Sequence, residues 1–233
     1  VLLTGSVDAD VPSRVWGGKE EYAVSPDGNT LYFTARLRDA REAWSTNYDV
    51  YAAPMSADGP AVNLTESNAA WDTQPVISPD GEQMAWLAMS RPGFEADRFR
   101  IMVRDLESGA TRELAPDWDR SPASIAFSKD GRQLFANAQD VGEKTLWRFD
   151  LKSGNADKIA AGGTINALDV SSGTIVFARD SLKSPNELYV LEDGKERRLT
   201  DFSGPQLASV EMGDDEQFNF EGAHGDTVHG YVM

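Results

Sequence analysis

The chain has 233 residues, and its 22 basic and 38 acidic side chains give a formal net charge of −16, which argues against a nucleic-acid partner because phosphate backbones are bound by clustered Lys and Arg. The sequence contains no cysteine, so disulfides, a thiolate nucleophile and a cysteine-rich zinc site are excluded. No apolar run approaches the length of a membrane-spanning helix, so no membrane partner is expected.

The first 18 residues contain no complete repeat. Residues 1–4 are predicted to be the end of a strand whose partners lie upstream, and Gly17-Gly18 marks a loop. We therefore expect the chain to be a piece of a longer protein. Residues 21–24 are then predicted to form a short strand that runs into a turn.

That turn has the pattern Ser-Pro/Lys-Asp-Gly, which occurs at residues 25–28, 78–81 and 128–131, and a weaker copy begins at Ser171. Proline fixes φ for the second position of a type I turn, aspartate suits the third, and glycine takes the left-handed conformation that joins two antiparallel strands. Each copy therefore predicts a β-hairpin.

A third and a fourth strand are predicted after each hairpin. The third strands are expected at residues 49–52, 101–104, 146–149 and 188–191, and the fourth at 62–65, 111–114, 156–159 and 197–200. Four strands in a repeat of this length are typical of a β-propeller blade, because one small sheet cannot bury both of its faces alone. The predicted fold is all-β: a partial β-propeller of about four four-stranded antiparallel blades near residues 20–65, 72–115, 121–160 and 164–200, within a segment 1–205.

Strand alternation predicts which side chains face which neighbouring blade. The side chains six positions beyond the motif serine should face one neighbour, and the next residue along should face the other. These two sets are Leu31, Met84 and Leu134, and Tyr32, Ala85 and Phe135. Inter-blade packing also explains Trp86 and Trp147 better than a sugar-binding platform does.

Two long connections, residues 36–48 and 89–98, both join a second to a third strand. They should emerge on the same rim, where insertions often build a binding surface. Arg91 in the second connection is a candidate for contacting a peptide's carbonyls or carboxylate. The ordinary alternative is a solvated charge on a surface loop.

The blade pattern ends after Thr200. Residues 207–212 and 216–220 are predicted to be strands, and residues 224–233 a hairpin whose second strand is interrupted. We expect residues 206–233 to hold the final strands and the start of a linker to a further domain. His224 and His229 are too loosely spaced for a predicted zinc site, and no metal or cofactor is expected.

The repeated turns resemble the prolyl-oligopeptidase family of serine peptidases, in particular its acylaminoacyl-peptidase and dipeptidyl-peptidase V branch. The resemblance also rests on Asn63-Leu64-Thr65, on the run from Trp71 to Gly81 and on the closing run from Gly225 to Met233. It implies a propeller that covers an α/β-hydrolase domain with a Ser-Asp-His triad. No Gly-x-Ser-x-Gly nucleophile elbow occurs in this sequence, so none of its residues is assigned a catalytic role.

The resemblance implies a non-catalytic propeller domain that is inactive alone, partners the hydrolase domain of the same protein, gates the access of short peptides and helps bind their amino-terminal side. A bacterial periplasmic or secreted location is expected, with the cytoplasm left open. The alternative is a stand-alone periplasmic propeller that acts as a scaffold for protein–protein interaction, like the Tol-associated propellers.

Glu20 and Glu21 are the other candidate substrate-binding residues. In dipeptidyl-peptidase relatives acidic propeller residues hold the substrate's free amino terminus, and a carboxylate pair facing a cavity would suit an ammonium group. The alternative is that both are solvated charges at the start of a strand. Finally, an incomplete ring would expose strand edges and apolar blade faces, so we expect the isolated piece to form homo-dimers or aggregates.

Overall fold

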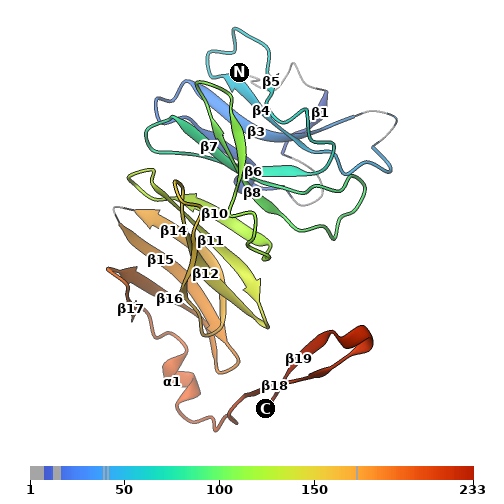
Figure 1. The fold of residues 1–233 in the computed structure, drawn as a ribbon. Helices are drawn as coiled ribbons and strands as arrows, with labels where there is room; N and C mark the ends of the chain where they lie inside the picture. The colour runs from blue at the N-terminus through green and yellow to red at the C-terminus, as the bar shows by residue number, and fades with distance from the viewer. Residues whose placement is uncertain (1–7, 13–16, 39, 41, 172) are drawn as a thin grey trace.

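A computed structural model describes residues 8–12, 17–38, 40, 42–171 and 173–233, and the strand predicted at residues 1–4 lies outside them. The described chain is almost entirely β-structure: a row of small antiparallel sheets is followed by a hairpin at the carboxyl end (Figure 1). We refer to the four repeats as blades 1 to 4.

The first two blades form separate sheets. Blade 1 contains β1 (Ala9–Asp10), β2 (Tyr22–Val24), β3 (Thr30–Leu37), β4 (Asp49–Pro54) and β5 (Val62–Asn63), with the short 3-10 helix η1 (Lys19–Glu21) before β2. Blade 2 contains β6 (Asp72–Ile77), β7 (Gln83–Ala88), β8 (Arg100–Asp105) and β9 (Thr111–Leu114).

The third and fourth blades are joined into one sheet by a parallel bridge between Lys144 and Thr164. Blade 3 contains β10 (Pro122–Phe127), β11 (Gln133–Asp140), β12 (Glu143–Asp150) and β13 (Ala156–Ala160). Blade 4 contains β14 (Thr164–Ser171), β15 (Thr174–Ser181), β16 (Ser184–Glu192) and β17 (Lys195–Arg198). An equivalent parallel bridge links Tyr48 to Trp71 between blades 1 and 2.

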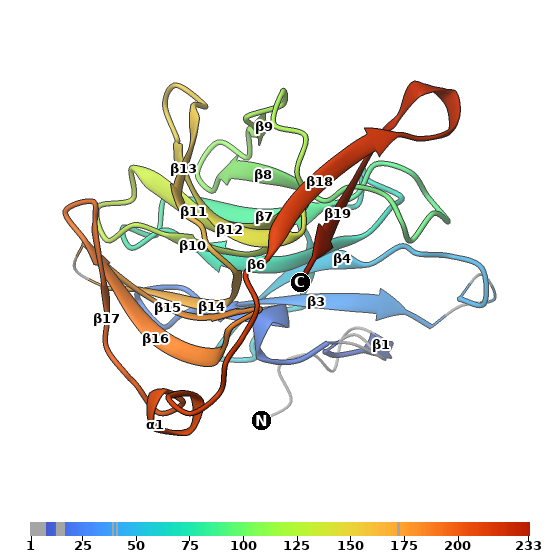
Figure 2. The ribbon, with the colours of Figure 1, turned by 90° about the horizontal axis from the view of Figure 1, so that it is seen from below.

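The innermost strands of the blades lie side by side: β2 contacts β6, β6 contacts β10, and β10 contacts β14. The remaining strands of each blade follow outward in chain order, which Figure 2 shows from a second direction. This radial arrangement of small antiparallel sheets, four-stranded except for the additional β1 in blade 1, confirms the predicted all-β, partial-propeller fold.

The repeated turns have the predicted conformation. Gly28, Gly81 and Gly131 have φ values of 74°, 77° and 66°. In the first copy Ser25 Oγ donates to Asp27 Oδ1 at 2.5 Å and accepts from the backbone N–H of Thr30 at 2.9 Å. The hydrogen bond from Ser25 lowers the pKa of Asp27, and the same contacts recur in the second and third copies.

Strand alternation divides the core as predicted. Tyr32 packs with Met84 between blades 1 and 2, Ala85 with Leu134 between blades 2 and 3, and Phe135 with Ile165 between blades 3 and 4. Trp86 belongs to the first of these clusters. Trp147 packs against the second, with its ring 5.5 Å from that of Trp118. The inter-blade role of both tryptophans is therefore confirmed.

Two predictions for the carboxyl end are wrong. Residues 207–212 do not form a strand. The short helix α1 (Gly204–Leu207), with Pro205 in its first turn, where proline's fixed φ is suited, ends at Leu207, and residues 208–212 form a turn and irregular chain. The hairpin does not lie within residues 224–233. It joins β18 (Glu216–Glu221) to β19 (Thr227–Val232) through the 3-10 turn η2 (Ala223–Gly225). Residues 224–233, predicted to contain both strands of a hairpin, therefore contain only β19.

Candidate functional site

One rim of the blades carries most of the sequence-predicted site. Because neighbouring strands are antiparallel, the start of a first strand, the end of a second and the start of a third lie at the same edge of a blade. We call this edge the loop rim, since it also carries the connections 38–48 and 89–99. The backbone N–H of Gly93 donates to Thr46 Oγ1 at 2.8 Å, which confirms that the two long connections emerge together.

In blades 2 to 4 the innermost strand (β6, β10 or β14) pairs irregularly with the next strand near the loop rim. The β6–β7 register shifts between Thr73 and Val76, and the β10–β11 and β14–β15 registers shift at matching places near Ala123 and Asn166. Gln74, in the first of these irregularities, has a φ of 54°. Bulges of this kind change the direction of side chains and leave some backbone groups without a partner in the sheet. Polar groups of the innermost strands can therefore contact the adjacent blade.

These groups form a chain of contacts around the inner strands. Thr73 Oγ1 donates to Glu21 Oε1 at 2.7 Å, linking blades 1 and 2, and Gln74 Nε2 donates to the carbonyl of Ala123 at 3.2 Å, linking blades 2 and 3. Ser124 Oγ donates to Asn137 Oδ1 at 2.8 Å, and Asn137 Nδ2 donates to the carbonyl of Ile165 in blade 4 at 2.8 Å. We call Glu21, Thr73, Gln74, Ser124 and Asn137 the inner collar.

Glu20 and Glu21 are both in η1, but the structure does not present them as a pair. Glu21 is 4% exposed and lies against β6, whereas Glu20 is exposed. Only Glu20 is therefore directly accessible to a ligand, while Glu21 anchors η1 to blade 2 through Thr73.

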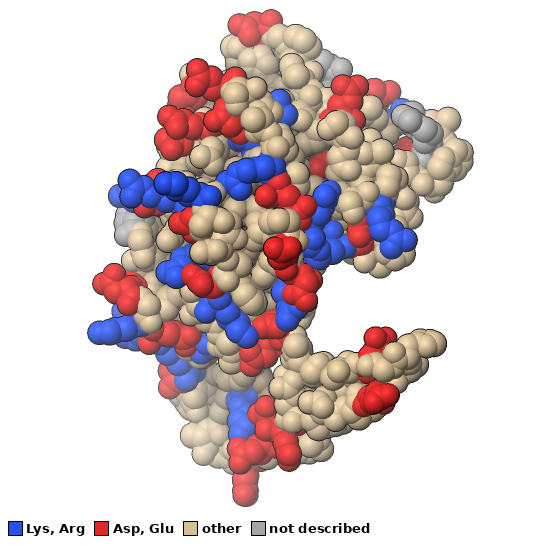
Figure 3. All heavy atoms as spheres, in the orientation of Figure 1, with Lys and Arg blue, Asp and Glu red and all other residues tan. Residues whose placement is uncertain are grey.

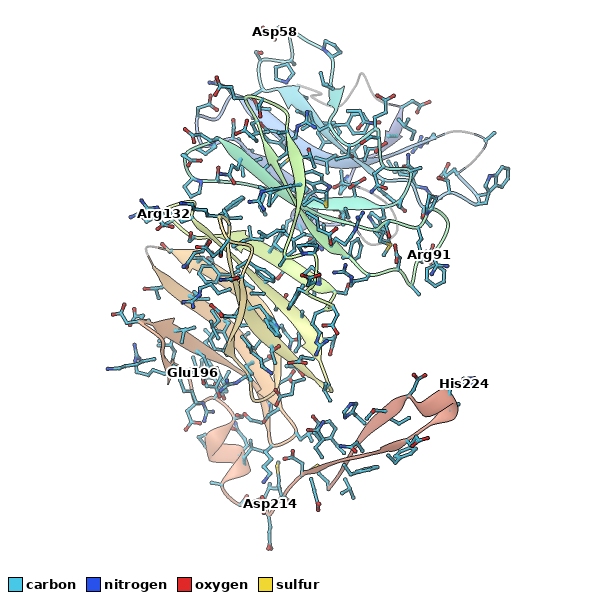
Figure 4. The ribbon with its side chains drawn as sticks, viewed as in Figure 1. Asp58, Arg91, Arg132, Glu196, Asp214 and His224 are labelled. Carbon is cyan, nitrogen blue, oxygen red and sulfur yellow. The ribbon has the colours of Figure 1, made fainter. Side chains whose placement is uncertain are left out.

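Arg91 is exposed on the second long connection, and Figure 4 shows it pointing away from the blades. Its guanidinium carbon lies 4.0 Å from the centre of the Phe94 ring, a cation–π contact. Within the described parts of the chain no carboxylate pairs with this guanidinium and no contact joins it to Glu20 or Glu21. Arg91 is thus a cation available to a ligand, at a separate point of the rim.

Sequence reasoning missed a buried carboxylate beside the rim. Asp72, at the start of β6, is 1% exposed and accepts hydrogen bonds from Trp86 Nε1 at 2.6 Å and Asn68 Nδ2 at 2.9 Å. Burial raises its pKa to about 7. No repeat pattern in the sequence marks this aspartate as buried, since the residue at the same place in blade 1, Lys19, is exposed.

A cavity of about 430 Å³ lies between the terminal hairpin and blades 3 and 4, lined among others by Glu143, Asp180 and Tyr231. Tyr231 Oη donates to the carbonyl of Val141 at 2.8 Å and so holds the hairpin against the β11–β12 turn. Figure 3 shows the hairpin standing out from the blades with a hollow beside it. Among the described residues, no cluster of three metal-ligating side chains occurs, and no helix has the length and apolar character needed to cross a membrane.

No protein-family model matches the chain. A dipeptidyl-peptidase 5 from Porphyromonas gingivalis is 31% identical over 182 residues, covering 77% of this chain, and one from Arthroderma otae is 28% identical over 245 residues, covering 97%. The chain matches the propeller portion of peptidases of the prolyl-oligopeptidase family. It spans 26% and 33% of the length of these two relatives.

Solved structures share the fold of this chain. An acylaminoacyl peptidase from Pyrococcus horikoshii superposes with a TM-score of 0.72 at 20% identity, over 96% of this chain and 32% of its own. The β-propeller domain of a trilobed protease from Pyrococcus furiosus gives 0.55 at 17% identity, over 75% and 54%. TolB from Acinetobacter baumannii gives 0.56 at 18% identity, over 77% and 43%. These likenesses support the propeller architecture.

Proposed function

We propose that this chain is the propeller domain of a serine peptidase, that it limits access to short peptides, and that its loop rim helps bind their amino-terminal side. The observation that carries the proposal is the loop rim itself, where an exposed carboxylate, the polar inner collar and an accessible guanidinium occur along one edge of the blades. The name dipeptidyl-peptidase 5 of the relatives fits a site that recognises a free amino terminus.

The proposed contact is between Glu20 and the substrate's ammonium group. A carboxylate and an ammonium form a charge-assisted hydrogen bond, which is stronger than a neutral one. Glu21 would act as a positioning residue, because its hydrogen bond with Thr73 fixes the short helix that carries Glu20. Within the inner collar, Gln74 and Ser124 are partly exposed and carry amide and hydroxyl groups of the kind that bind peptide backbone.

The cleavage step belongs, in this proposal, to an α/β-hydrolase domain of the same polypeptide. There a serine would attack the scissile carbonyl and form an ester that water resolves. The propeller segment, residues 1–205, and the linker beginning within 206–233 would contribute binding and access only. A bacterial periplasmic or secreted location is part of the same proposal.

The test uses the full-length protein and chromogenic dipeptide substrates. Glu20→Gln should raise KM about three- to tenfold with little change in kcat, since an exposed charge contact is lost. Glu107→Gln, in an exposed turn of blade 2 at the opposite rim, is the matched control. An unchanged KM for Glu20→Gln, or labelling of the isolated chain by a serine-directed phosphonate, would contradict the proposal.

The alternative is a scaffold for protein–protein interaction, which the shared fold with TolB favours. The two functions differ in what the extended reading frame encodes. A hydrolase domain with a nucleophile elbow beyond Met233 supports the peptidase, whereas another blade or a stop codon supports the scaffold.

A further inference from the structure

The loop rim contains a small pocket that has no role in the proposed function. It has a volume of about 290 Å³ and lies between the two long connections, lined by Trp44, Ser45, Asn47, Ala69, Pro92 and Gly93. Trp44 is 73% exposed. Tryptophan side chains are highly buried on average, and here the exposed indole forms one wall of a concave site, where an apolar ligand group could cover it.

The first connection is held in place from within. The Arg36 guanidinium donates to the carbonyls of Glu42 and Ser45, and it also donates to Tyr48 Oη at 3.3 Å. These hydrogen bonds tie the part of the connection that carries Trp44, residues 42–48, to the end of β3.

The second connection is equally fixed. Asp97 Oδ2 accepts hydrogen bonds from Ser90 and from the backbone N–H of Arg91 at 2.9 Å. Gly93 has a φ of 74° and donates its N–H to Thr46 Oγ1, which is buried. Two walls held by hydrogen bonds and joined to each other by a partly buried one make a preformed pocket, and preformed sites bind with little ordering cost.

The charge beside the pocket indicates its ligand. Arg91 directly precedes Pro92 of the pocket wall and places its guanidinium over Phe94. A cation held on an aromatic ring suits a carboxylate, and a pocket walled by Trp44 and Pro92 suits an apolar side chain. A volume of about 290 Å³ is enough for one such side chain.

We propose that this pocket binds an apolar side chain of a short peptide whose adjacent residue carries a carboxylate, and that Arg91 pairs with that carboxylate. The inference rests on the proposed function and adds a preference for peptides that place an acidic residue next to an apolar one. Trp44 and Arg91 are then specificity-determining residues, distinct from Glu20.

The experiment is an NMR titration of the full-length protein with acetyl-Phe-Glu amide, followed through the backbone N–H signal of Gly93 and the indole signal of Trp44. Acetylation removes the ammonium group, so Glu20→Gln should leave the affinity unchanged. The two proposals can therefore fail separately. Replacing Glu by Gln in the peptide should weaken binding about three- to fivefold, as expected for one exposed charge pair.

Arg91→Met should weaken binding of the Glu peptide by the same factor without affecting the Gln peptide. Arg132→Met, in an exposed turn at the opposite rim, is its control. Trp44→Ala should weaken both peptides about tenfold, and it leaves the fold intact because the side chain packs on little. The inference is overturned if neither signal moves at saturating peptide, if the two peptides bind alike, or if Arg91→Met and Arg132→Met behave identically.

Discussion

The surroundings of Asp72 make its protonation change near neutral pH. Its carboxylate accepts hydrogen bonds from Trp86 in β7 and from Asn68 in the β5–β6 connection. The nearby Asp49 disfavours the charged form of Asp72, and Arg100 favours it. Burial outweighs these contacts and raises its pKa from 3.8 to about 7. The folded protein therefore binds a proton here at a pH where the unfolded chain does not.

We expect the free energy of unfolding to fall as pH rises, because a raised pKa stabilises the fold below the unfolded value and this gain is lost as pH passes about 7. Between pH 5 and 8 the contribution amounts to roughly 1 to 3 kcal/mol. Urea unfolding should show this slope flattened in Asp72→Asn. Asp58→Asn, at an exposed turn, should keep the wild-type slope, and an equal slope in both variants would refute the role of Asp72.

Single residues also show what the sequence can and cannot predict. The Ser25 turn was predictable because its hydrogen-bond partners lie within five positions of one another. The inner collar was not, because the bond from Gln74 to Ala123 spans 49 positions and depends on bulges that no local pattern marks. Glu21 was singled out for its charge, but its burial against Thr73 follows from how two blades stack.

Among the elements, the hairpin of β18 and β19 has the weakest attachment to the blades. Phe218, Phe220 and Val228 are 44%, 54% and 38% exposed, and an isolated two-stranded hairpin is marginally stable. Its anchor is Tyr231, whose ring lies so close to Gly142 that an added Cβ would sit 2.4 Å from Cε2. The absence of a side chain at Gly142 is what lets the hairpin dock.

Gly142→Ala should release the hairpin, and hydrogen exchange across residues 216–232 should rise. Gly173→Ala is the matched control, because both glycines have a φ of 85° and a Cβ at Gly173 meets nothing within 4 Å. Each substitution should cost about 1 kcal/mol of backbone strain. Faster exchange in both variants, or in neither, would show that the Tyr231 contact does not hold the hairpin.

Element boundaries were predictable where turn chemistry set them and wrong where it did not. Strands flanked by the repeated turns follow from the positive φ of glycine and the alternation of apolar residues. The segment after Thr200 lacks both signals. Its apolar residues gave a strand prediction at 207–212, where the structure has the last residue of α1 followed by a turn and irregular chain. The two halves of the hairpin were recognised as β-structure but paired with the wrong partners.

At the scale of the whole molecule, the described row of blades ends on blade 4. On β16, Tyr189 and Leu191 face blade 3, so strand alternation places Leu188 and Val190 on the opposite face. Leu188 is 43% exposed there, and Phe202, a few residues beyond β17, is 77% exposed. Apolar blade faces of this kind normally meet another sheet.

We predict that the isolated chain associates through this face. Sedimentation velocity should show concentration-dependent dimers or larger species, and Leu188→Lys should shift the population toward monomer because a charge cannot be buried in the contact. Leu182→Lys, at a turn where the side chain is 56% exposed, should leave association unchanged. A monomer at high concentration in the unmodified chain would refute the prediction.

The bridge between Lys144 and Thr164 has a further consequence. It joins blades 3 and 4 at one position, where the backbone N–H of Lys144 donates to the carbonyl of Gly163 at 3.1 Å, so unfolding of either blade removes a hydrogen-bond partner from the other. Blades 3 and 4 should therefore unfold together in one cooperative thermal transition, although they are separate repeats in the amino-acid sequence.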